Sequence, residues 1–270
     1  MPSATRTVFP VVAAIAVCLS GGCSLIPRQG PVTKEMAAAR RLSNEALLAV
    51  DRQDLSRAET LLATAVKSCP ADIDSRRHYA EVLWKRGEKL QAVAQIKEAL
   101  RLDPGDVPLS VAAGAMVLEL GLLDDADSLA GSAVTLSPRS ADAWHLHGQV
   151  ALARGRPEEA LADFQRSLAL DPDDKQVLLD TAEVYRRLNR PRRALSTLAV
   201  LEEHYGVDGP PANVLALAGL AQEALGRPED AIDCYRRALA KGNPPEGIAE
   251  RLAALSSPSE VPADASPIVR

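Results

Sequence analysis

The sequence predicts an all-α protein built from stacked helical hairpins, and three observations lead to this prediction. Hydrophobic residues make up 47% of the 270 residues but aromatic residues only 3%, so the core is expected to consist mainly of alanine and leucine, which favour helices. Four similar octets begin at a constant step of 34 residues: AVKSCPAD (65–72), ALRLDPGD (99–106), AVTLSPRS (133–140) and SLALDPDD (167–174). Small residues recur in phase with them. A fixed period of this length is typical of helical repeat proteins.

Aligning the octets divides most of the chain into six segments of 34 residues. They are 39–72, 73–106, 107–140, 141–174, 175–208 and, after the insertion 209–211, 212–245. The eighth position is always small: Ala46, Ala80, Gly114, Gly148, Ala182 and Gly219. The twentieth is always alanine: Ala58, Ala92, Ala126, Ala160, Ala194 and Ala231. Small side chains at these places let two helices approach closely, because the distance between helix axes depends on the residues at the contact.

Each segment is predicted to form one helix, a turn and a second helix. The stretch ARGRPEEA (153–160) shows the turn, where Gly155 ends one helix and Pro157 begins the next. A proline near the end of most segments stops the second helix, because proline lacks a backbone N–H and clashes with the preceding turn. The octets therefore mark the boundary between one hairpin and the next.

The fourth segment carries the residues of a known consensus. It resembles the tetratricopeptide repeat at Trp144, His147, Gly148, Ala151, Gly155, Ala160, Phe164, Ser167 and Pro172. The resemblance implies six such repeats over 39–245, stacked into a right-handed superhelical solenoid with a concave groove. The other segments depart from the family at the consensus aromatic place of the first helix, which holds Leu42, Arg76, Ser110, Leu178 and Leu215.

The two ends of the chain are expected to differ from the repeats. Residues 245–255 read as a helix that caps the last repeat, and 256–270, rich in serine, proline and alanine, as a disordered tail. Residues 8–19 form an apolar run of 12 residues, the length of a signal-peptide core, whereas a membrane-spanning helix needs about 20. Residues 1–22 are therefore predicted to be a signal peptide.

The signal resembles that of a bacterial lipoprotein, which implies that Cys23 is lipidated and that 23–38 link it to the repeats. Ser20 stands where that family prefers an aliphatic residue, so an ordinary cleaved signal and an uncleaved anchor remain alternatives. Ser24 is not the aspartate that retains enterobacterial lipoproteins in the inner membrane. The expectation is an exported protein that faces the periplasm and is held by its lipid, with the outer membrane favoured.

Several function classes are not expected. The net charge is −5 at pH 7 with a pI near 5.5, which disfavours nucleic-acid binding. Phosphate-binding loops, nucleophile elbows and zinc motifs do not occur in the sequence, and His145 and His147 are predicted to point to different sides of a helix. We therefore expect no enzyme activity, cofactor, metal or small-molecule substrate.

The expected function is binding of a peptide or protein partner, and the resemblance places the binding residues on the first helix of each repeat. The groove residues so predicted are Asp74, Arg77, Glu81, Trp84, Val111, Leu118, His145, Gln149, Glu183 and Arg186. Trp84 is the expected anchor, because aromatic residues dominate interfaces, although packing against the next repeat is an equal alternative.

Two features leave the functional interpretation open. Five arginines lie within 186–193, and they either dock an acidic partner or lipid headgroups or form a solvated turn. The favoured function is an envelope-anchored adaptor. The alternative is an accessory lipoprotein that assembles an envelope machine such as a pilus, a secretion system or the outer-membrane assembly apparatus.

Overall fold

A computed structural model describes residues 33–257, so the predicted signal peptide, Cys23 and nearly all of the tail lie outside the described residues. The described part is all-α. Its helices are α1 (Lys34–Asp51), α2 (Leu55–Ser68), α3 (Ile73–Lys85), α4 (Lys89–Leu102), α5 (Val107–Glu119), α6 (Leu123–Leu136), α7 (Ala141–Ala153), α8 (Pro157–Leu170), α9 (Lys175–Arg187), α10 (Pro191–Glu203), α11 (Ala212–Ala224), α12 (Pro228–Ala240) and α13 (Ile248–Ser256).

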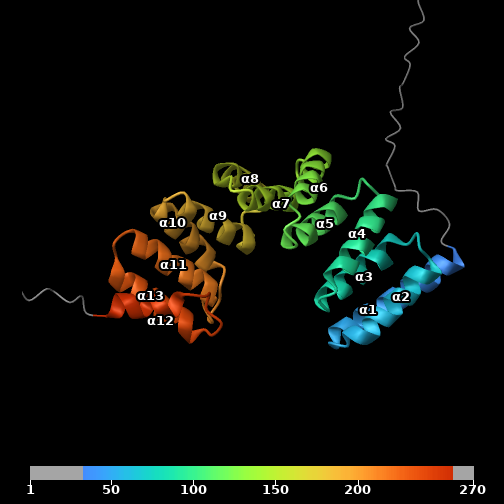
Figure 1. Cartoon of the computed structure of the whole chain (residues 1–270), viewed down its shortest axis with the longest axis horizontal. Helices are drawn as coiled ribbons and strands as arrows, with labels where there is room; N and C mark the ends of the chain where they lie inside the picture. Colours follow the sequence, from blue (N-terminus) through green and yellow to red (C-terminus); the bar gives the residue numbers. More distant parts are fainter. Residues whose placement is uncertain (1–32, 258–270) are drawn as a thin grey trace, which may run out of the picture. The chain divides into compact units, whose positions relative to one another are not determined.

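Consecutive helices pair into hairpins, and each hairpin packs on the next. The pairs run from α1 with α2 to α11 with α12, and α13 packs on α12. Figure 1 shows the hairpins following one another in chain order from α1 to α12. First helices also contact one another, as α5 contacts α7 and α7 contacts α9. The predicted all-α helical repeat fold is confirmed.

The turn inside each hairpin needs a residue in the left-handed backbone region. That residue is the fifteenth of each repeat, with φ values of 70° to 84° at Gly87, Gly121, Gly155 and Gly226. The remaining two repeats place Gln53 (φ 63°) and Asn189 (φ 54°) there. Glycine adopts this conformation without strain, which explains its recurrence. Asparagine tolerates it better than most other residues.

The last residue of each of the four octets caps the first helix of the next hairpin. The side chains of Asp72, Asp106, Ser140 and Asp174 accept hydrogen bonds from backbone N–H groups in the first turn of α3, α5, α7 and α9, at 2.8 to 3.2 Å. A cap of this kind stabilises a helix by about 1 kcal/mol. The repeated octet therefore both ends one helix and starts the following one.

Small residues allow the close approach of the two helices in a hairpin. All six alanines at the twentieth position are fully buried. A Cβ atom on Gly148 would lie 2.5 Å from the ring of Phe164, and one on Gly219 would lie 2.4 Å from the ring of Tyr235. Glycine at the eighth position is thus what leaves room for an aromatic side chain from the second helix.

The closing helix begins at Ile248 rather than at 245. Gly247 has a φ of 82° and directly precedes it, so the helix cannot extend further back. Ile248 is buried and packs in one cluster with Leu215 and Tyr235, against the last repeat. Over residues 33–257, none of the helices combines the length and the hydrophobicity needed to cross a membrane.

Candidate binding groove

The predicted groove residues all lie on first helices. Asp74, Arg77, Glu81 and Trp84 are on α3, Val111 and Leu118 on α5, His145 and Gln149 on α7, and Glu183 and Arg186 on α9. A hollow of about 490 Å³ opens along α5, α7 and α9. It is lined by Ala115, Leu118, Glu119, Gln149, Leu152, Ala153, Asp180 and Arg187. Two of the predicted residues, Leu118 and Gln149, line this hollow.

The hollow combines apolar side chains with the charged side chains of Glu119, Asp180 and Arg187. Ala115, Leu118 and Leu152 supply the apolar surface. Asp180 accepts hydrogen bonds from Nε2 of His145 at 2.7 Å and from Nε2 of Gln149 at 3.0 Å. These bonds join α7 to α9 and hold the two polar side chains of α7 in place. The hollow therefore offers an apolar seat beside fixed hydrogen-bonding groups.

Asp180 was not among the predicted site residues. The structure shows that it follows His145, the fifth residue of the fourth repeat, by 35 residues and contacts it across that interval. The same offset joins Ser43 to His78, with 2.9 Å between Oγ and Nδ1. In these two pairs the fifth position of one repeat contacts the sixth of the next, and the His145 side chain is only 15% exposed.

The α9 side of the groove is a compact cluster of charges. Glu183 accepts hydrogen bonds from Arg186 and Arg187, all at 2.8 Å. Burial acts to raise the pKa of Glu183, but the hydrogen bonds from the two arginines outweigh it and hold the pKa below its ordinary value. Glu183 is therefore ionised at neutral pH and fixes the arginine that lines the hollow, Arg187.

None of the predicted α3 residues lines the hollow. Trp84 is half-buried against the core that α3 and α5 share. Lys89 places its Nζ 5.1 Å from the centre of the Trp84 ring and 2.5 Å from the carboxylate of Glu119, a lining residue. Arg77 pairs with Asp74 at 3.5 Å. Trp84 thus packs against a neighbouring repeat and is linked to the hollow through Lys89 and Glu119.

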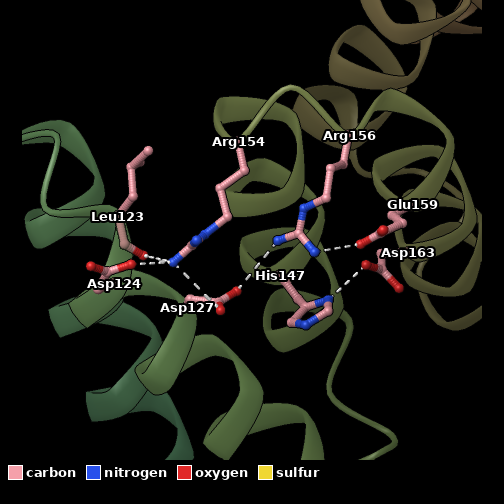
Figure 2. A network of polar contacts seen from close by, with 8 residues as sticks. All are labelled: Leu123, Asp124, Asp127, His147, Arg154, Arg156, Glu159 and Asp163. Atoms are coloured by element: carbon pink, nitrogen blue, oxygen red, sulfur yellow. Dashed lines mark hydrogen bonds and ion pairs between the residues drawn. The ribbon is translucent and has the colours of Figure 1, made fainter.

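A second polar network lies at the joint between the third and fourth repeats, as Figure 2 shows. Arg154 donates to the carbonyl oxygen of Leu123 at 3.1 Å and to Asp124 at 2.7 Å. Its guanidinium is also 3.6 Å from Asp127, which in turn lies 3.8 Å from Arg156. These contacts join α6 to the end of α7, so the network holds two repeats together.

His147 belongs to the same region and is a structural residue. Its Nδ1 lies 2.6 Å from the Asp163 carboxylate, which is only 4% exposed and also pairs with Arg166. The hydrogen bond with Asp163 raises the pKa of His147 above its ordinary value, against the opposing effect of burial. Within 33–257, no group of three histidine, cysteine or acidic side chains is arranged to hold a metal ion.

A hydrogen bond explains why Arg76 can stand at the position where the family consensus has an aromatic residue. Trp144 donates its indole N–H to the carbonyl oxygen of Pro138 at 2.9 Å. Arg76, at the same position two repeats earlier, donates from Nε to the carbonyl oxygen of Pro70 at 2.7 Å. In α3 the arginine thus replaces the tryptophan of α7 as the donor that ties the first helix to the preceding proline turn.

Repeated hairpins whose first helices line a hollow define a helical repeat protein. Family models described as tetratricopeptide repeat match residues 43–107 and 117–175, residues 151–218, and residues 214–248. The chain belongs to the tetratricopeptide repeat family.

Curated relatives match parts of longer proteins. A DnaJ homolog subfamily C member 7 homolog from Schizosaccharomyces pombe is 22% identical over 70% of this chain and 35% of its own length. The mouse protein O-mannosyl-transferase TMTC1 is 31% identical over 54% of this chain and 16% of its own length. The chain therefore aligns with about a third or less of these relatives.

Solved structures resemble the chain over most of its length. PilF of Pseudomonas aeruginosa superposes with a TM-score of 0.67 at 18% identity, over 82% of this chain and 98% of PilF. PilW, described as a widely conserved type IV pilus biogenesis factor, superposes with a TM-score of 0.70 at 18% identity, over 81% of this chain and 98% of PilW. Likeness at this identity establishes a shared fold.

Proposed function

We propose that this chain is a non-catalytic, envelope-anchored adaptor that binds a segment of a peptide or protein partner in the groove along α5, α7 and α9. The observation that carries the proposal is the hollow, which sets Leu118 and Leu152 beside Gln149 and Asp180. Concave surfaces of helical repeats commonly serve as extended binding surfaces. No small-molecule substrate, nucleic acid or cofactor is part of the proposal.

The chemistry of the hollow favours a partner segment with one apolar side chain. Burying an aliphatic side chain against Leu118 and Leu152 contributes about 1.5–3 kcal/mol. Asp180 is held by hydrogen bonds from His145 and Gln149 to one carboxylate oxygen and from Gln176 to the other at 2.9 Å. An oxygen with a single donor keeps one lone pair that can accept from a partner's N–H group. Pre-positioned groups lose little side-chain entropy on binding, which favours affinity.

Anchoring to the envelope is proposed from the sequence of residues 1–23. A signal of lipoprotein type would leave a lipid on Cys23 and export the repeats to the periplasmic side, with the outer membrane favoured. A Cys23→Ser variant tests this: we expect it to lose incorporation of a labelled fatty acid while the repeats still fold. Incorporation equal to that of the wild-type chain would refute lipidation at Cys23.

A second candidate function is assembly of an envelope machine. It is supported by the shared fold with PilF and PilW, the latter described as a pilus biogenesis factor. The two candidates differ in what occupies the groove. An assembly factor would capture a structural subunit of the machine, whereas a general adaptor would capture a soluble or regulatory protein.

The groove is tested by photo-crosslinking in the cell from position 118, with position 101 on α4 as the control probe. We expect one dominant partner from Leu118 and none from Arg101, which is exposed on a second helix. Mass spectrometry of that partner distinguishes the two candidate functions. Equal capture from both positions, or no capture at all, would overturn the groove proposal.

A blocking variant adds a second readout. Ala115 is exposed and lines the hollow, so Ala115→Arg fills the hollow without disturbing the core. Ala162→Arg is the matched control, because Ala162 is an exposed alanine on the second helix α8. We expect the first variant to abolish crosslinking from Leu118 and the second to leave it unchanged. Crosslinking that survives Ala115→Arg would place the partner elsewhere.

A further inference from the structure

The turn between α9 and α10 carries an exposed basic surface, here named the arginine patch and defined by Arg190, Arg192 and Arg193. All three side chains are exposed, and they surround a hollow of about 410 Å³ whose other lining residues are Asn189, Pro191 and Leu225. Leu225 belongs to the following turn, between α11 and α12. The patch is therefore a concave site between two adjacent turns rather than a protruding loop.

The arginines of the patch lack carboxylate partners among residues 33–257. Elsewhere in the described chain some exposed arginines are paired, as Arg101 is with Glu98 and Arg166 with Asp163, and others such as Arg139 are not. The patch differs in that three unpaired arginines lie within four residues. In the patch, Arg193 lies 5.9 Å from the centre of the Tyr185 ring, and no ion pair involves Arg190 or Arg192. The neighbouring Arg186 and Arg187 are different, because both are held by Glu183. The positive charge of the patch is thus available to a ligand.

Three other repeats carry the opposite charge at the same two positions. The positions of Arg192 and Arg193 in α10 are occupied by acidic pairs in three other second helices: Asp124 and Asp125 in α6, Glu158 and Glu159 in α8, and Glu229 and Asp230 in α12. Each acidic residue in the first turn stabilises a helix by about 0.3–1 kcal/mol, because it interacts favourably with the positive end of the helix dipole. Arginines in the first turn give no such stabilisation. The fold therefore does not require these arginines and would be better served by acids.

We propose that the arginine patch binds an acidic peptide segment of a partner protein, with an apolar side chain of that segment seated against Leu225 and Pro191. The arginines supply charge complementarity, and guanidinium groups bind carboxylates bidentately. A broad anionic surface such as a bilayer fits less well, because the same positions on the preceding and following turns present Glu158, Glu159, Glu229 and Asp230 to it. A short segment contacts only the patch.

The chain's own tail is a competing occupant. Residues 258–270 include two acids, Glu260 and Asp264, with apolar residues near both. The two side-chain carboxylates of the tail can neutralise only two of the three arginines, whereas an acidic segment with more carboxylates can neutralise all three. We therefore assign the site to a partner protein. Deletion of residues 258–270 distinguishes between these two occupants.

The test is fluorescence anisotropy of a labelled peptide in which glutamates alternate with leucines, titrated with the full chain. The test variant is Arg192→Glu with Arg193→Glu, which installs the charges of three other repeats and is expected to fold. Arg139→Glu with Arg236→Glu is the matched control, because both arginines are exposed, unpaired within 33–257, and give the same change in net charge. We expect the test variant to lose at least about tenfold in affinity and the control to bind like the wild type.

Two further measurements complete the test. A peptide with glutamine in place of glutamate is expected to bind at least about tenfold more weakly, and added salt to weaken binding of the acidic peptide, as for exposed charges. Equal loss in both double variants would overturn the proposal. So would peptide binding that appears only after residues 258–270 are deleted, which would assign the site to the tail, or binding to phosphatidylglycerol vesicles without binding to the peptide.

Discussion

Replacing Gly148 by alanine tests the close approach of helices within a repeat. The added Cβ would lie 2.5 and 2.6 Å from two carbons of the Phe164 ring and 3.2 Å from the carbonyl oxygen of Ala160. Phe164 is fully buried, so its ring has no free space into which to move. Either α7 and α8 separate or the ring leaves its preferred rotamer, and both changes reduce the packing of the fourth repeat.

The expected change in the free energy of unfolding is the difference between the cost of overpacking and the gain in helix propensity. Overpacking a core costs about 1–3 kcal/mol, and replacing glycine by alanine inside a helix returns about 1 kcal/mol. We therefore expect Gly148→Ala to lower the free energy of unfolding by up to about 2 kcal/mol. The matched control is Gly131→Ala in α6, where a Cβ meets nothing within 4 Å. That variant is expected to raise stability by about 0.5–1 kcal/mol.

The assay is urea denaturation of both variants, followed by far-ultraviolet circular dichroism. Phe164→Leu provides a third check, because a smaller side chain at 164 is expected to reduce the cost of Gly148→Ala in the double variant. If Gly148→Ala and Gly131→Ala stabilise the chain equally, the steric explanation of the small eighth position is wrong.

The remaining predictions concern single contacts. The hydrogen bond with Asp163 raises the pKa of His147 in the folded protein above its unfolded value of about 6.5. Protonated His147 therefore stabilises the folded state fully at pH values below about 6.5, and this stabilisation is lost as the pH rises through the folded pKa. We expect Asp163→Asn to abolish this pH dependence of the unfolding midpoint, measured from below about pH 6.5 to above the folded pKa. An unchanged pH profile would contradict the assignment of the effect to His147 and Asp163. Arg154→Ala removes the contacts with Leu123 and Asp124 and is expected to cost about 1 kcal/mol, more than Arg156→Ala, in urea unfolding. Equal losses would show that the joint does not depend on Arg154. Trp84→Ala is expected to weaken partner capture, and loss of stability alone would support the packing interpretation.

The repeats were predictable because their causes are local. Gly155 ends a helix through its own backbone conformation, Pro157 starts the next one, and Asp174 caps the helix that follows it by a bond to a residue three positions away. A constant period then requires the same hairpin each time, and stacking follows because one hairpin cannot bury its own apolar face. The small eighth and twentieth positions marked the helix contacts for the same reason.

The predicted site was less complete than the fold. Of the ten residues predicted from family positions, Leu118 and Gln149 line the hollow, and their role in binding stays a prediction. Family positions did not reveal that His145 is engaged by Asp180, because that contact joins two repeats and depends on which residue types meet there. The nearly buried Asp163 was missed in the same way, as an aspartate on a second helix is usually solvated.

By itself, the sequence determined the period, the helical hairpins and their order, because each of these depends on backbone conformation and on patterns within one repeat. Only the tertiary structure decided where the groove is hollow, that Arg76 serves in place of a tryptophan, and that Arg187 is held by a carboxylate while Arg190 and Arg192 are not. These properties depend on contacts between side chains from different turns and different repeats. Such contacts are set by distance in space, which the order of residues along one chain does not contain.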